Sequence, residues 1–125
     1  FFFFFFFFFF FFFFFSFLDV NLDYVAHIMF AIDSSQLSNE RDFRKQKDLT
    51  KIIARLLNLQ EGKTRAGVIS FGNISDTSIS FGQYSDVFEF NRALDLIPMV
   101  GGDRHFDKAL KKALEAFSKD RYGKS

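Results

Sequence analysis

Residues 24–38 read YVAHIMFAIDSSQLS, an apolar run that stops at an aspartate and continues into a small polar loop. A strand that is apolar on successive residues is buried on both faces, which is typical of the middle of a parallel α/β sheet. Asp33 then lies at the carboxyl end of that strand, where open α/β sheets keep their ligand crevice. Asp33, followed by Ser34 and Ser35, therefore marks either a functional site or the remains of one.

Two further strands are predicted downstream. Residues 65–71 (RAGVISF) form a second buried run, and residues 77–81 (TSISF) alternate between polar and apolar, as a half-exposed edge strand does. Helical stretches lie between and after these strands, which gives the order β-α-β-β-α-α. The chain is therefore expected to belong to the α/β class, with no buried strand after its last helix.

Three stretches carry apolar residues at helical spacing, and each predicts one buried stripe and one solvated face. Ser38 or Asn39 can cap the first helix, and Ser85 can cap the second. Lysines such as Lys47 are expected on the solvated faces. The three stripes comprise Phe43, Leu49, Ile52, Ile53, Leu56 and Leu57; then Val87, Phe88, Asn91, Leu94 and Ile97; and last Phe106, Ala109, Leu110, Ala113, Leu114 and Phe117.

The composition excludes several classes of function. A net charge of +1, from 16 basic and 15 acidic residues, provides no strong field toward nucleic acid, so we expect no nucleic-acid partner. The absence of cysteine from the sequence rules out a disulfide framework and thiolate chemistry within it.

The first 15 residues are all phenylalanine, and residues 1–18 form a low-complexity apolar segment near the lower length limit for spanning a bilayer. A signal peptide would show a basic region before such a run and a small-residue cleavage site after it, and neither is present. The run is either an artefact or a hydrophobic targeting segment, and membrane contact is expected only if it is real. We place residues 1–18 outside the fold and assign residues 19–125 to the domain.

From about Asp19 onward the sequence resembles a von Willebrand factor type A domain. The resemblance rests on AIDSS after the first strand, DFRKQKDLTKIIARLL in the first helix, KTRAGVISFG in the second strand, and FNRALDLIPMVGG running into DKALKKALEAF. It is closest to the extracellular matrix type found in matrilin-like and collagen-associated chains. The resemblance implies a Rossmann-like, doubly wound and mostly parallel sheet with one antiparallel edge strand. It covers a partial domain that is truncated at its C-terminal end.

The family's metal-ion-dependent adhesion site, which holds Mg²⁺, is expected to be degenerate here. Its first loop reads Asp-x-Ser-x-Ser; Asp33 and Ser35 match, but Leu37 stands at the last position and has no oxygen to offer. Its second loop reads Gly-Gly-x-Thr, and Arg104 stands at the threonine position. A guanidinium carries only donors and a positive charge, so it cannot ligate a cation. Asp33 and Ser35 are thus vestigial metal ligands, and Arg104 is predicted to pair with Asp33 in place of the ion.

Catalysis is not expected. Ser34 or Ser35 with His105 would need an acidic orienter and an oxyanion hole, and the sequence identifies neither. His27 and His105 do not form a zinc-ligand cluster.

The resemblance implies a protein-binding or adhesion module in the extracellular matrix. The family's Mg²⁺ is expected to be lost here because of Leu37 and Arg104, so no cofactor is expected. Its partner would be collagen or another matrix protein, bound through a surface other than the metal face. Two alternatives remain open at this point. The chain could be a truncated, non-functional gene product, or an intracellular scaffold of the same superfamily.

Overall fold

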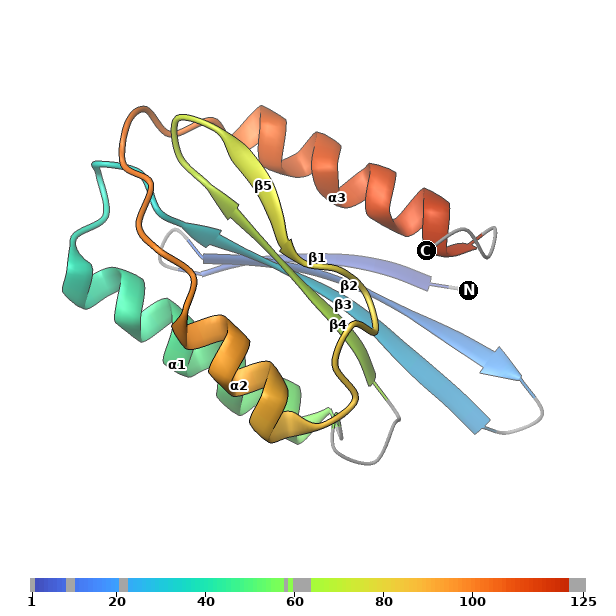
Figure 1. Cartoon of the computed structure of the whole chain (residues 1–125). Coiled ribbons are helices and arrows are strands. Elements are labelled where there is room, and N and C mark those ends of the chain that lie inside the picture. Colours follow the sequence, from blue (N-terminus) through green and yellow to red (C-terminus); the bar gives the residue numbers. More distant parts are fainter. Residues whose placement is uncertain (1, 9–10, 21–22, 58, 60–63, 122–125) are drawn as a thin grey trace.

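The computed structural model describes residues 2–8, 11–20, 23–57, 59 and 64–121, which form one mixed β-sheet with helices on both of its faces (Figure 1). The elements in chain order are β1 (Phe2–Phe8), β2 (Phe11–Val20), β3 (Asp23–Asp33), α1 (Glu40–Leu56), β4 (Thr64–Phe71), β5 (Ser75–Ile79), α2 (Val87–Asp95) and α3 (Phe106–Arg121). From β3 onward this is the predicted order β-α-β-β-α-α. Within the described part of the chain, no helix has the length and apolarity needed to cross a bilayer.

The five strands lie side by side in chain order, β1-β2-β3-β4-β5. β3 and β4 pair in parallel, joined by the crossover helix α1, and β5 pairs antiparallel with β4 at the sheet edge. The parallel pair and the antiparallel edge strand confirm what the resemblance implied for this part of the sheet. The pairs β1–β2 and β2–β3 are antiparallel, so the sheet as a whole is mixed.

The phenylalanine run lies inside the sheet, where composition predicted a segment outside the fold. β2 pairs with β3 from Phe12 opposite Ala31 to Val20 opposite Asp23, so this strand crosses the expected boundary between residues 18 and 19. The physical reason is that backbone pairing needs only an open strand edge, and β4 covers just one edge of β3. Whether the run is a targeting segment stays a prediction.

β3 is buried on both faces, as its apolar sequence predicts. Ile28, Phe30 and Ile32 join the core under α1 and α2, whereas Met29 and Ala31 join the core under α3. Figure 1 shows these layers, with α1 and α2 on one side of the sheet and α3 on the other. The doubly wound arrangement thus follows from one strand that supplies apolar residues to two cores.

The buried stripes of the helices are narrower than predicted. In α3, Ala109, Ala113 and Phe117 are buried, but Leu110 and Leu114 are 43% and 50% exposed. A single sheet face covers only the central line of a helix, so residues at the margins of the apolar stripe remain in solvent. For the same reason, Ile52 and Leu56 of α1 are exposed; in α2 the stripe runs through Phe90 and Leu94, and Phe88 is exposed.

The helix starts follow the capping rules, with one correction. Asn39 caps α1, because its Oδ1 accepts the backbone N–H of Asp42 at 2.8 Å. The cap of α2 is Asp86 rather than Ser85, and its Oδ1 accepts the N–H of Phe88 at 2.8 Å. A carboxylate serves this position better because its charge also complements the positive end of the helix dipole.

Lys47 was placed on the solvated face of α1 by its charge, and this prediction is wrong. The side chain is only 9% exposed, and its Nζ donates to the carbonyl oxygens of Ile97 at 2.6 Å and Asp95 at 3.2 Å. The Nζ also lies 4.5 Å from the centre of the Phe43 ring. Burial lowers the pKa of the amine below its usual range, although the nearby Asp95 charge opposes this shift. Lys47 therefore fastens the end of α2 to α1.

Replacing Lys47 with methionine should destabilise the domain by about 1–2 kcal/mol, because two carbonyl oxygens lose a charged donor. The quantity to measure is the free energy of unfolding in urea. Lys45→Met, at an exposed position of the same helix, is the control and should change it by less than about 0.5 kcal/mol. Equal stability of the two variants would show that the buried amine does not link the helices.

Candidate functional site

The candidate site lies at the carboxyl end of β3, where three chain segments meet. Asp33 is the last residue of β3 and is fully buried. The next residue, Ser34, donates its N–H to the carbonyl oxygen of Phe71 at the end of β4, at 2.8 Å. The carbonyl oxygen of Ser34 accepts the N–H of Gly101 at 2.7 Å, which brings the loop before α3 to the same place. This is the edge of an α/β sheet at which ligands bind.

The carboxylate of Asp33 is held by donors on both of its oxygens. Oδ1 accepts the backbone N–H of Ser35 at 2.9 Å. Oδ2 accepts both Nε and Nη2 of Arg104, each at 2.7 Å. The Arg104 side chain is only 11% exposed and also lies over the ring of Phe106, 5.5 Å from its centre. The predicted Arg104–Asp33 pair is confirmed.

Gln46, which the sequence analysis did not single out, fixes the backbone on the other side of Asp33. Its Oε1 accepts the N–H of Asp33 at 2.7 Å, and its Nε2 donates to the carbonyl oxygen of Asp33 at 3.0 Å and the hydroxyl of Ser38 at 3.4 Å. A signal was present in the sequence, because Gln46 follows Phe43 by three residues and so lies on the buried face of α1. A polar side chain at such a position needs a partner.

The loop before α3 comes close to the sheet because of glycine. Gly102 has a φ of +75°, and a Cβ there would lie 2.3 Å from the Cβ of Asn73. At Gly72 an added Cβ would lie 2.6 Å from the carbonyl oxygen of Gly101. The carbonyl oxygen of Gly102 in turn accepts the N–H of Gln36 at 2.9 Å. These contacts bring Arg104 within reach of Asp33.

The residues present do not fit a divalent cation. A guanidinium lies at the carboxylate oxygen that a cation would need, and both oxygens of Asp33 already accept hydrogen bonds. The hydroxyl oxygen of Ser35 accepts the N–H of Leu37 at 3.3 Å, as in a local turn. The Leu37 side chain is 64% exposed and offers no oxygen. Asp33 and Ser35 are therefore brought together, but in a site built for an arginine.

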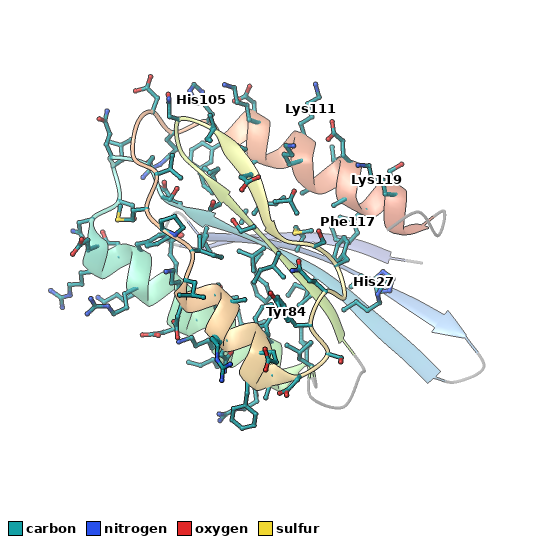
Figure 2. The ribbon with its side chains drawn as sticks, in the orientation of Figure 1. His27, Tyr84, His105, Lys111, Phe117 and Lys119 are labelled. Carbon is teal, nitrogen blue, oxygen red and sulfur yellow. The ribbon has the colours of Figure 1, made fainter. Side chains whose placement is uncertain are left out.

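The serines show no arrangement for nucleophilic catalysis. The Ser34 hydroxyl donates to the carbonyl oxygen of Phe71 at 3.3 Å, and in the described part of the chain neither Ser34 nor Ser35 pairs with a histidine. His27 lies six positions before Asp33, near the middle of β3, and the centre of its ring is 6.0 Å from that of Phe81 (Figure 2). Among the described residues, no three His, Cys, Asp or Glu side chains gather as a metal site.

Comparison with known proteins places these features in a family. The family model for the von Willebrand factor type A domain matches residues 27–125. The chain is 29% identical over 92 residues to the collagen alpha-4(VI) chain of Mus musculus, a match that covers 74% of this chain and 4% of that protein. It is 28% identical over 98 residues to human von Willebrand factor A domain-containing protein 2, which covers 78% of this chain and 13% of the relative.

Solved structures show the same fold. Proximal thread matrix protein 1 from the mussel byssus superposes with a TM-score of 0.64 at 18% identity, over 72% of this chain and 24% of that one. A membrane spanning protein from Vibrio fischeri superposes with a TM-score of 0.54 at 17% identity, over 76% of this chain and 50% of that one. The chain therefore spans only a small part of the curated relatives it matches and at most half of these structures.

Replacing Arg104 with alanine should destabilise the domain by about 3 kcal/mol, because it leaves the fully buried carboxylate of Asp33 without its counter-charge. Thermal and urea unfolding measure the loss. Adding Asp33→Asn to the same variant should recover part of it, since the uncompensated charge is then removed. Arg44→Ala, at an exposed position of α1, is the matched control. An unchanged melting temperature in Arg104→Ala would refute a stabilising role for the pair.

Proposed function

Because the chain belongs to the von Willebrand factor type A domain family, we propose that it is a protein-binding module that engages its partner without a divalent cation. The observation that carries the proposal is the pair of 2.7 Å contacts from Arg104 to Oδ2 of Asp33. The guanidinium neutralises the carboxylate permanently. A metal ion is then needed neither for stability nor for binding.

The partner proposed is collagen or another protein of the extracellular matrix, and the module itself would be extracellular. The relatives named as collagen chains support this setting. No catalysis is proposed, because the hydroxyls of Ser34 and Ser35 are engaged with the backbone.

The metal face is a poor candidate for the contact. In a site that holds a cation, an acidic side chain of the partner completes the coordination shell, so the charge of the ion draws the two proteins together. Here the positive charge is that of the Arg104 guanidinium, which is paired with Asp33, and the Arg104 side chain is only 11% exposed. We therefore expect the partner to bind another part of the surface.

Binding should be unaffected by removal of divalent cations. The whole chain is passed over immobilised collagens and other purified matrix proteins in a surface plasmon resonance measurement, first with millimolar Mg²⁺ and then with EDTA. We expect saturable binding to at least one of them, with the same Kd in both buffers. Millimolar Mg²⁺ should also leave the melting temperature unchanged. Binding that disappears in EDTA, or no binding to any matrix protein, would contradict the proposal.

A further inference from the structure

A groove runs between α3 and the edge strand β5. Two neighbouring cavities form it, with volumes of about 260 Å³ and about 220 Å³. They share Lys112 and Glu115 of α3, so they are parts of one depression. On the side of the sheet, Ser75 and Thr77 of β5 line them.

One wall of the groove is a row of lysines. Lys108, Lys112 and Lys119 are spaced by four and seven residues, which places them on one face of α3, and Lys111 lies beside them. All four are exposed, and none forms an ion pair with the residues that the structure describes. Figure 2 shows Lys111 and Lys119 on α3, with Phe117 between the helix and the sheet. The only acid that shares the lining of both cavities is Glu115, so the wall is basic.

The opposite wall is the open edge of β5, where a β-bulge determines which side chains face α3. Thr77 pairs with Ile69, and Ile79 pairs with Val68, so Ser78 is an extra residue in β5. The bulge turns Thr77 toward α3, with Ile69, while Ile79 enters the core on the other face of the sheet. Among the described strands, none pairs with the outer edge of β5. Unpaired backbone groups at such an edge can accept another strand.

Two details indicate a ligand with both polar and apolar groups. The buried hydroxyl oxygen of Ser75 has no hydrogen-bond partner in the described structure. The deeper part of the groove is lined by the apolar side chains of Met29, Phe81 and Ala116. The acid of β5, Asp76, lines neither cavity, because adjacent side chains in a strand point to opposite faces.

We propose that this groove binds an extended, acidic peptide segment of the partner protein, which adds as a strand to the edge of β5. The lysine row spans about 16 Å from Lys108 to Lys119 at the helical rise per residue. From Ser75 to Ile79, β5 extends over about 14 Å at the strand rise per residue. A single strand can therefore pair with β5 and present carboxylates to the lysines along the same length. The proposal identifies the surface that the proposed function leaves open, and it rests on that function.

A sulfated polysaccharide would also be attracted by the lysines, but the groove favours a peptide. A polysaccharide has no backbone amides to pair with a strand edge, whereas strand addition is a recurring mode of peptide recognition. Alternation along the added strand would direct acidic side chains to α3 at every second residue. An apolar side chain at one of these same α3-facing positions, near Met29 and Phe81, would fill the deeper cavity.

The test uses a fluorescently labelled synthetic peptide with Glu at every second position, Leu in place of one central Glu and Thr at the positions between, with the whole chain as receptor and anisotropy as the readout. We expect saturable binding that weakens about tenfold in Lys112→Glu/Lys119→Glu and weakens further with added salt. The matched control is Arg44→Glu/Lys45→Glu, which makes the same change in net charge on α1 and should bind as the wild type does.

A second peptide separates strand addition from charge attraction. It has the same sequence, but alternate backbone nitrogens carry methyl groups, so it keeps its carboxylates and cannot form a strand ladder. Loss of binding by this peptide supports the proposal. Equal binding of both peptides to the wild type would overturn it, as would unchanged binding of the first peptide to Lys112→Glu/Lys119→Glu. Binding of heparin without binding of either peptide would also overturn it.

The experiments can refute the peptide site in the groove without refuting the proposed function. If Lys112→Glu/Lys119→Glu leaves binding to the immobilised matrix protein unchanged in EDTA, the module still binds without metal, but through another surface. If no matrix protein binds and the peptide does, the groove is a peptide site and the proposed matrix partner is wrong.

Discussion

The structure depends on how a single buried charge is neutralised. Asp33 is fully buried at the end of the central strand, where an unpaired carboxylate would cost several kcal/mol. Two nitrogen atoms of Arg104 at 2.7 Å offset that cost, and the N–H of Ser35 satisfies the second oxygen. Backbone hydrogen bonds hold the loop that carries Arg104 against the sheet. The ion pair and these bonds together join three segments of the chain at one place.

Part of this junction could be predicted from the residues themselves, and part from the family resemblance, which implies that the loops of Asp33 and Arg104, 71 positions apart, meet at one site. The apolar run before Asp33 indicates a strand buried on both faces, and the exchange of a hydroxyl for a guanidinium at Arg104 indicates a counter-charge. The faces of the helices were harder to predict. Periodicity locates the centre of an apolar stripe, but its width depends on how much of the helix the sheet covers, which left Leu110 and Leu114 exposed. Lys47 and Gln46 were missed because their partners are backbone atoms of other chain segments, 50 positions away for Lys47 and 13 for Gln46.

The phenylalanine run could not be placed from its sequence for a different reason. Register between strands is normally specified by which side chains face the core, and fifteen identical residues carry no such information. What places β2 is the open edge of β3. In a doubly wound sheet of order 3-2-1-4, where β3 corresponds to strand 1, that edge belongs to strand 4, which would run parallel to β3. Here an antiparallel strand from before β3 lies there instead. The open edge of β3 therefore determines where a strand can be added, whatever the sequence of that strand.

The ion pair and the groove are connected through the start of α3. Arg104 precedes the first residue of α3, Phe106, by two positions, and the Phe106 ring lies 5.5 Å from that of Phe71 at the end of β4. The guanidinium of Arg104 lies over the Phe106 ring, so the ion pair with Asp33 and the contact between Phe106 and Phe71 together anchor the first turn of α3. An anchored first turn fixes the distance between α3 and the sheet, and hence the spacing between the lysine row and β5. Arg104, at one end of the sheet, would thereby hold the basic wall of the proposed peptide site in place along its edge.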